Sequence, residues 1–209
     1  MLGHFRRAAD GEFPAADGGF TMLPPVAGGK SAVVAFTGHA FIATDMALAD
    51  IDDLPLDGFG AAHGPGLLVR LARGGLIDVI DATMFARGRG GGSLPLTTSL
   101  DDHPRVRYAR SLRADVVVHG DEGGFVTLAN GLAGRREMSV EIPDTSRGVG
   151  VGRALIEEAL RLVPAGELLF AAVSPGNTRS LRAFLAIGFT PICSEVIITP
   201  PDLIRAAWP

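Results

Sequence analysis

Three glycines stand at every second position in the stretch SRGVGVGRALIEEALRLV, which begins at Ser146 and runs directly into a helical pattern. Glycine in place of alanine costs roughly 0.5–1 kcal/mol inside regular structure, so Gly148, Gly150 and Gly152 are expected to serve a purpose. A glycine turn between a strand and a helix leaves the first N–H groups of the helix unpaired, and these groups attract anions together with the helix dipole. The pattern therefore predicts a phosphate-binding turn, and a plain tight turn is the alternative.

Two carboxylates precede the glycines in the stretch EMSVEI. Met138, Val140 and Ile142 occupy every second position there, which indicates a half-buried strand. Glu137, Ser139 and Glu141 alternate with these apolar residues. A carboxylate beside a reacting amine can serve as a general base, whereas the alternative is that both residues only form the solvent-facing side of the strand.

The elements around these residues follow from local patterns. The stretch ADVVVHGDEGGFVTLANG predicts an antiparallel hairpin, and RREMSVEIP predicts the next strand. A helix follows the glycines, ELLFAAVS predicts a buried strand, NTRSLRAFLAIGF predicts a second helix, and TPICSEVIITP predicts a closing strand. Upstream, HPRVRYARSLR predicts a short helix.

The N-terminal half has weaker patterns. Residues 1–30 are rich in Gly, Ala, Pro and Asp without a period, so a loosely ordered extension is expected there. Residues 31–100 are expected to form an α/β part of uncertain role, with strands in SAVVAFTGHAFIATD, a helix in GPGLLVRLARGG and a strand in GLIDVIDATMFARG.

Two kinds of nucleotide-binding turn are compatible with a glycine-rich strand-to-helix connection. The dinucleotide fingerprint requires G-x-G-x-x-G and an acidic residue at the end of the following strand. Here the spacing is G-x-G-x-G, and Glu167 stands at the start of that strand. The sequence therefore disfavours dinucleotide binding.

Read as R-x-x-G-x-G over Arg147, Gly150 and Gly152, the turn resembles the pyrophosphate loop of the GCN5-related N-acetyltransferases (GNAT). A second helix in that family typically reads N-x-x-[AS]-x-x-x-[YF]-x-x-x-G-F. This chain matches that pattern at Asn177, Ser180, Phe184, Gly188 and Phe189. The strand EMSVEI is similar to the catalytic strand of the phosphinothricin-type members, and the resemblance extends over roughly residues 102–199.

This resemblance implies an α/β fold of the α+β type with a mixed, mostly antiparallel central sheet, and an acetyl-CoA-binding core over residues 101–209. It implies an N-acyltransferase that moves an acetyl group from acetyl-CoA to a primary amine. Glu137 is then expected to be the base, with Glu141 as second choice. Because Phe184 replaces the tyrosine that many members use as an acid, Tyr108, the only tyrosine, or solvent would protonate the leaving thiolate.

Coenzyme contacts are implied for three groups of residues. Backbone amides of the β-strand would bind the thioester, the glycine turn would bind the pyrophosphate, and the second helix would bind the remaining parts of the coenzyme. The residues are Val140, Ile142, Arg147, Gly148, Val149, Gly150, Val151, Gly152, Arg153, Asn177, Ser180 and Phe184.

Composition restricts the other function classes. The chain has 209 residues, a formal net charge of -4 and one cysteine, Cys193, which rules out an internal disulfide and a cysteine-rich metal site. No basic run indicates nucleic acid or a membrane surface, no metal is expected, and a bacterial-type cytoplasm is the default location. The expected partner is a small-molecule or peptide amine, with a homodimer as an option. A non-catalytic acyl-CoA-binding or protein-interaction module is the alternative function.

Overall fold

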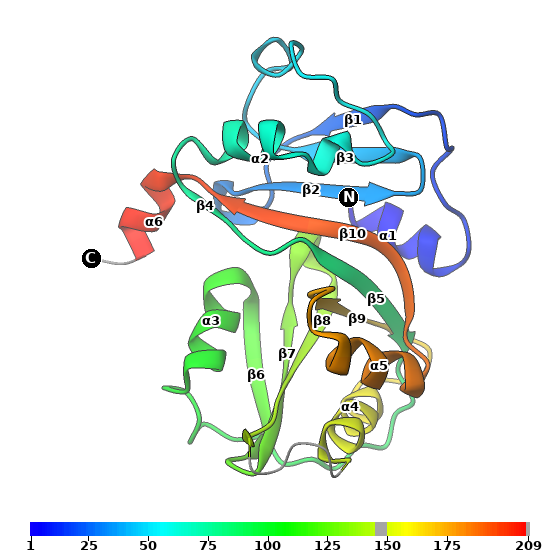
Figure 1. Ribbon diagram of the computed structural model, residues 1–209. Coiled ribbons are helices and arrows are strands. Elements are labelled where there is room, and N and C mark those ends of the chain that lie inside the picture. The colour runs from blue at the N-terminus through cyan, green and yellow to red at the C-terminus, as the bar shows by residue number, and fades with distance from the viewer. Residues whose placement is uncertain (145–149, 208–209) are drawn as a thin grey trace. The chain divides into compact units, whose positions relative to one another are not determined.

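The computed structural model of the protein describes residues 1–144 and 150–207, which belong to two compact units. Unit 1 comprises Met1–Thr83 with Ile192–Pro209, and unit 2 comprises Met84–Pro191. Both units combine helices with mostly antiparallel strands (Figure 1). The expected mixed α/β fold class is therefore confirmed.

The strands of unit 1 pair in the order β1-β3-β2-β10, and β4 also pairs with β10. The β1–β3 pair is parallel and the others are antiparallel. The elements are α1 (Leu2–Ala9), β1 (Phe20–Leu23), β2 (Ser31–Phe36), β3 (His39–Ala43), α2 (Pro65–Ala72), β4 (Leu76–Ile77), β10 (Thr190–Thr199) and α6 (Pro201–Ala207), with 3₁₀ turns at Ala27–Gly29, Leu48–Asp50 and Ala61–His63.

The structure corrects the expectation of a loosely ordered extension over residues 1–30. Helix α1 forms there, and its Phe5 is fully buried, with its ring centroid 6.2 Å from that of Phe36. Strand β1 pairs with β3 along its whole length, from Phe20 to Leu23. A two-turn helix and a four-residue strand are too short to show a period in the sequence. They are stabilised by tertiary packing, which the sequence pattern does not reveal.

The strands of unit 2 follow the order β5-β9-β8-β7-β6. The helices expected after the glycines and in NTRSLRAFLAIGF are confirmed as α4 and α5. The elements are β5 (Asp81–Arg87), which begins in unit 1, α3 (Pro104–Leu112), β6 (Ala114–Asp121), β7 (Gly124–Asn130), β8 (Arg136–Glu141), α4 (Val151–Leu162), β9 (Leu168–Val173) and α5 (Thr178–Ile187), with a 3₁₀ turn at Leu132–Gly134.

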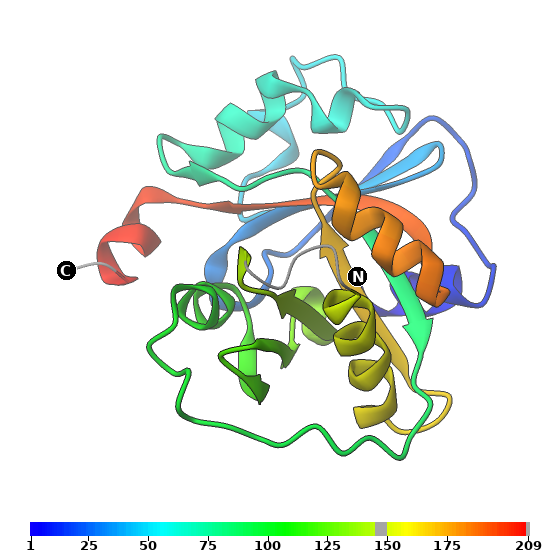
Figure 2. The ribbon, with the colours of Figure 1, turned by 60° about the horizontal axis from the view of Figure 1, so that its bottom comes forward.

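The two faces of this sheet are covered by different helices. Val126, Leu128 and Met138 belong to the main core, to which α4 and α5 contribute their buried sides. These two helices lie side by side (Figure 2). Phe125 lies on the opposite face and packs with Val106 of α3. Alternation along β7 and β8 therefore decides which residues reach α4 and α5 and which reach α3.

The division into units differs from the boundaries expected near residues 30 and 100. β10 pairs antiparallel with β2 from Ser194 to Ile198, so the end of the chain returns to the N-terminal strands. The expected core over residues 101–209 is thereby divided at Pro191. Pairing between segments this far apart leaves no trace in local composition or periodicity.

Candidate active site

Strand β8 is paired very differently on its two sides. Every one of its residues has a partner on β7, from Arg136 with Asn130 to Glu141 with Phe125. With β9 it shares one parallel register position, Glu137 with Phe170. Every second peptide group of a strand points towards each neighbour, so within the described residues the β8 groups beyond Glu137 that face β9 have no register partner there and could bind a ligand.

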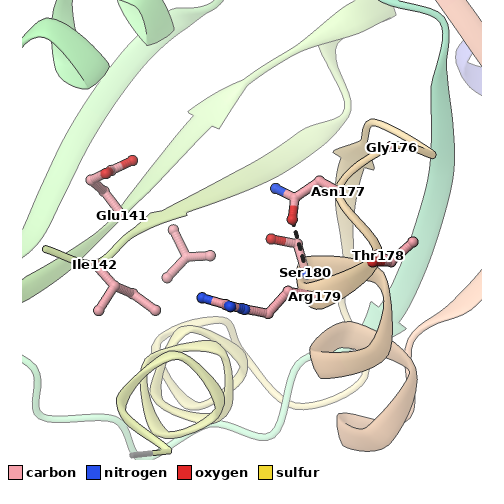
Figure 3. A pocket seen from close by; sticks show the side chains of 8 residues that line it. Glu141, Ile142, Gly176, Asn177, Thr178, Arg179 and Ser180 are labelled. Atoms are coloured by element: carbon pink, nitrogen blue, oxygen red, sulfur yellow. Dashed lines mark hydrogen bonds between the residues drawn. The ribbon is translucent and has the colours of Figure 1, made fainter. Parts of the chain in front are cut away.

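A cavity of about 450 Å³ lies where β8 ends. One wall comes from the end of β8, and the other comes from the loop after β9 and the first turn of α5 (Figure 3). The residues that line it are Val140, Glu141, Ile142, Gly176, Asn177, Thr178, Arg179 and Ser180. The structure thus brings Val140, Ile142, Asn177 and Ser180 together around one cavity.

Asn177 is both the N-cap of α5 and a cavity residue. Its Oδ1 accepts the backbone N–H of Ser180 at 3.1 Å. With the oxygen used in this way, the side-chain amide N–H groups of Asn177 face β8, and the Ser180 hydroxyl points into the same space (Figure 3). The capping role and a role in ligand binding are therefore compatible at Asn177.

The start of α4 lies against the same wall. Gly150, its N-cap, has φ +91°, a left-handed conformation that side chains other than glycine rarely adopt. A Cβ at Gly152 would lie 2.5 Å from Cδ1 of the cavity residue Ile142, so glycine permits this close approach. Within residues 1–144 and 150–207, no side chain caps the first N–H groups of α4, and N–H groups at a helix start can bind an anion.

The remaining residues expected in the glycine turn have different surroundings. Arg147, Gly148 and Val149 lie outside the described residues. Val151 packs against the main core of unit 2, so only its backbone can contribute to anion binding. Arg153 is exposed on the first turn of α4.

The two candidate bases have unlike environments. Glu141 lines the cavity, and its side chain extends from β8 on the side opposite to Ile142 (Figure 3). Glu137 is 3% exposed. Its Oε2 accepts from Nε and Nη2 of Arg135 at 3.0 and 2.8 Å, and its Oε1 lies 2.6 Å from Nη2 of Arg113.

This ion-pair cluster opposes proton uptake by Glu137. Burial alone would raise the pKa of the Glu137 carboxyl, but the charges and hydrogen bonds of Arg135 and Arg113 hold that pKa below its ordinary value. Arg135 itself is 1% exposed and lies over the Phe170 ring, 5.5 Å from its centroid. A carboxylate stabilised as an anion in this way is a poor proton acceptor, and its geometry favours a structural role.

Glu137→Gln is expected to lower the free energy of unfolding by about 3–5 kcal/mol, because two buried guanidiniums lose their counter-charge. Urea denaturation measures this change. Glu167→Gln is the matched control, since Glu167 is half exposed and 3.7 Å from Arg136, and it should change stability by less than about 1 kcal/mol.

The pH dependence has a definite sign. The pKa of the Glu137 carboxyl is lower in the folded protein than its ordinary value of 4.5. Its contribution to the free energy of unfolding is therefore complete above pH 4.5 and is lost as the pH falls through the folded-state pKa. The Glu137→Gln variant should therefore show less loss of stability below that pH than the parent protein. Equal acid sensitivity in both proteins would contradict the role of this ion-pair cluster.

Tyr108 and Phe184, like Glu137 and the described residues of the glycine turn, do not line the cavity. Tyr108 lies on α3 with 42% exposure, and Arg105 stacks over its ring with Cζ 5.6 Å from the centroid. Phe184 is 3% exposed in the main core, its ring edge to face with Phe189 at a centroid distance of 4.9 Å. Helical spacing places Phe184 one turn beyond Ser180, where α5 faces the core.

The sequence analysis missed three of the cavity residues, Gly176, Thr178 and Arg179. Of these, Arg179 carries a charge. It occupies the second position of α5, whose first turn carries no acidic residue. A cation at the positive end of a helix dipole is unfavourable, so its presence there was a signal for an anionic ligand.

The described residues contain no candidate metal site. Across residues 1–144 and 150–207, no group of three or more His, Cys, Asp or Glu side chains could hold a metal ion. Within the same part of the chain, none of the helices is sufficiently long and apolar to cross a membrane.

Comparisons with known proteins give distant structural similarity. No protein-family profile and no curated protein matches the chain. Among solved structures it is similar to an acetyltransferase of the GNAT family from Colwellia psychrerythraea, with 9% identity and a TM-score of 0.38 over 58% of this chain and 56% of that one. It is also similar to a GCN5-related N-acetyltransferase from Kribbella flavida, with 17% identity and a TM-score of 0.35 over 66% of this chain and 64% of that one. The alignments span less than two thirds of either structure.

Proposed function

We propose that the protein is an N-acyltransferase that moves an acetyl group from acetyl-CoA to the primary amine of a small molecule or peptide. The observation that carries the proposal is the polar cavity at the point where β8 parts from β9, with the starts of α4 and α5 beside it. Its volume of about 450 Å³ suits the reactive end of a thioester coenzyme. The spacing of the glycine turn and of the Asn177 helix supports the same ligand.

The residues around the cavity fit the parts of such a coenzyme. The backbone amides at the start of α4, from Gly150 onward, would hold its pyrophosphate. The Asn177 amide and the Ser180 hydroxyl, which face the cavity, would bind the pantetheine arm. A β8 amide near Val140 would donate to the thioester oxygen, where negative charge develops during attack.

Acetyl transfer also requires a neutral amine. We propose Glu141 as the base, because it lines the cavity while Glu137 is held in its ion pairs. The acceptor approaches from the Glu141 side of β8, and its ammonium gives a proton to the carboxylate. The amine nitrogen then bonds to the carbonyl carbon as the C–S bond breaks, and the nitrogen releases its second proton to solvent to give the neutral amide. The thiolate takes its proton from solvent, since thiols have pKa values near about 8.5.

A non-catalytic acyl-CoA-binding module is the second candidate. It is favoured by the absence of a tyrosine among the described residues that line the cavity, and by the burial of Phe184 in the core. In this case the coenzyme binds, but no acetyl group moves.

Acetyl-CoA is expected to stabilise the protein by about 2.7 kcal/mol at about 100 times its dissociation constant, because it binds the folded state. Thermal denaturation measures this shift, with NAD as the control ligand. Release of free thiol from acetyl-CoA in the presence of a panel of primary amines then tests catalysis. No thermal shift would contradict the coenzyme assignment, and a shift without thiol release for any amine would support the binding module.

A further inference from the structure

Arg179 is a cation in an unfavourable helix position. It is the second residue of α5, at the positive end of the helix dipole, and the first turn of α5 has no acidic residue. Among residues 1–144 and 150–207, the guanidinium of Arg179 has no ion-pair or hydrogen-bond partner. It is the one arginine or lysine among the described residues that line the cavity.

The direction of the Arg179 side chain indicates which side of β8 its guanidinium faces. Arg179 extends from α5 towards Ile142, and both residues line the cavity (Figure 3). Ile142 in turn approaches the first turn of α4, since a Cβ on Gly152 would lie 2.5 Å from its Cδ1. The guanidinium is therefore directed to the side of β8 on which α4 begins, and Glu141 extends on the other side.

We propose that Arg179 selects the phosphorylated coenzyme by pairing its guanidinium with the pyrophosphate oxygens. This inference rests on the proposed function and adds a specificity residue to it. An arginine presents a planar fork of N–H donors that matches phosphate oxygens in pairs. In a chain with a net charge of -4, a local cation is needed at the anion, because the overall charge gives no attraction.

The separation of charges across β8 agrees with this assignment. The coenzyme is an anion, and the amine acceptor is a cation before it loses its proton. Arg179 on one side and Glu141 on the other attract the two substrates to opposite sides of the strand. Arg179 thereby contributes to binding and to orientation but takes no part in the transfer of the acetyl group.

The test compares three thioesters of decreasing charge by isothermal titration calorimetry at one ionic strength. These are acetyl-CoA, its 3′-dephospho derivative and S-acetylpantetheine, which has no phosphate. Arg179→Gln should weaken binding of acetyl-CoA and of the dephospho derivative by about ten-fold or more, and should leave binding of S-acetylpantetheine unchanged. Arg179→Lys should restore part of the loss, because it keeps the charge without the fork.

Arg182→Gln is the matched control, since Arg182 is exposed on the same helix and does not line the cavity. It should bind all three thioesters like the parent protein. Equal acetyl-CoA affinity for Arg179→Gln and the parent overturns the inference, as does a loss confined to acetyl-CoA, which would place Arg179 at the 3′-phosphate. Failure of the parent protein to bind acetyl-CoA would instead overturn the proposed function.

Discussion

Turnover of the Glu141→Gln variant is expected to fall by about 10²–10⁴-fold, the range for loss of a general base. Glutamine keeps the shape of the side chain but cannot accept the proton of the acceptor's ammonium. Glu141 lines the cavity from the side of β8 opposite to Ile142 and Arg179, so the coenzyme contacts remain. Affinity for acetyl-CoA should therefore be unchanged, and the loss should appear in kcat.

Steady-state thiol release with a saturating amine measures this effect, and calorimetry measures coenzyme binding. Glu157→Gln, an exposed residue of α4, is the control for removal of one surface carboxylate. Full activity of Glu141→Gln between about pH 6 and 9 would exclude Glu141 as the base, because the reaction would then proceed without its carboxylate over the whole range.

The second large effect concerns the anion site at the start of α4. Gly150→Asp should abolish the thermal stabilisation by acetyl-CoA, about 2.7 kcal/mol at about 100 times the dissociation constant. Among the described residues, no atom lies within 4 Å of a Cβ on Gly150, so the new carboxylate has room beside the first N–H groups of α4. It would repel the pyrophosphate and compete for the same donors.

Gly150→Asn is the matched variant for this experiment. Asparagine and aspartate have the same shape, and both tolerate the left-handed conformation that φ +91° requires. Any strain from replacing glycine is thus common to both variants, and they differ by one charge. Most of the stabilisation by acetyl-CoA should remain in Gly150→Asn. If Gly150→Asp is stabilised as strongly as Gly150→Asn, the pyrophosphate does not bind at this turn.

The sequence by itself predicts those parts of the protein whose signals are local. The period of two in EMSVEI indicates β8, and the helical patterns after Gly150 and after Asn177 indicate α4 and α5. Glycine is favoured where the backbone is left-handed, and asparagine is favoured at a helix N-cap. These residue types therefore indicate where α4 and α5 begin. For this reason the cavity walls contributed by β8 and α5 could be expected from the sequence.

Only the tertiary structure separates Glu137 from Glu141. Alternation places both carboxylates on the same face of β8, so the sequence pattern treats them alike. Glu137 lies where β8 still pairs with β9, and Arg113 and Arg135 enclose it there. Glu141 lies at the end of the strand, beside the cavity. The environment of each group is decided by contacts with residues from other elements.

The same reason explains what the sequence left undetermined in the rest of the chain. The packing of Phe5, the return of β10 to β2 and the burial of Phe184 depend on segments that meet only after folding. Arg179 becomes significant only when α5 is placed opposite the end of β8. Local patterns determine which elements form, because helix and strand periods are short. Their pairing determines the site, because the charges and donors that meet there come from distant parts of the chain.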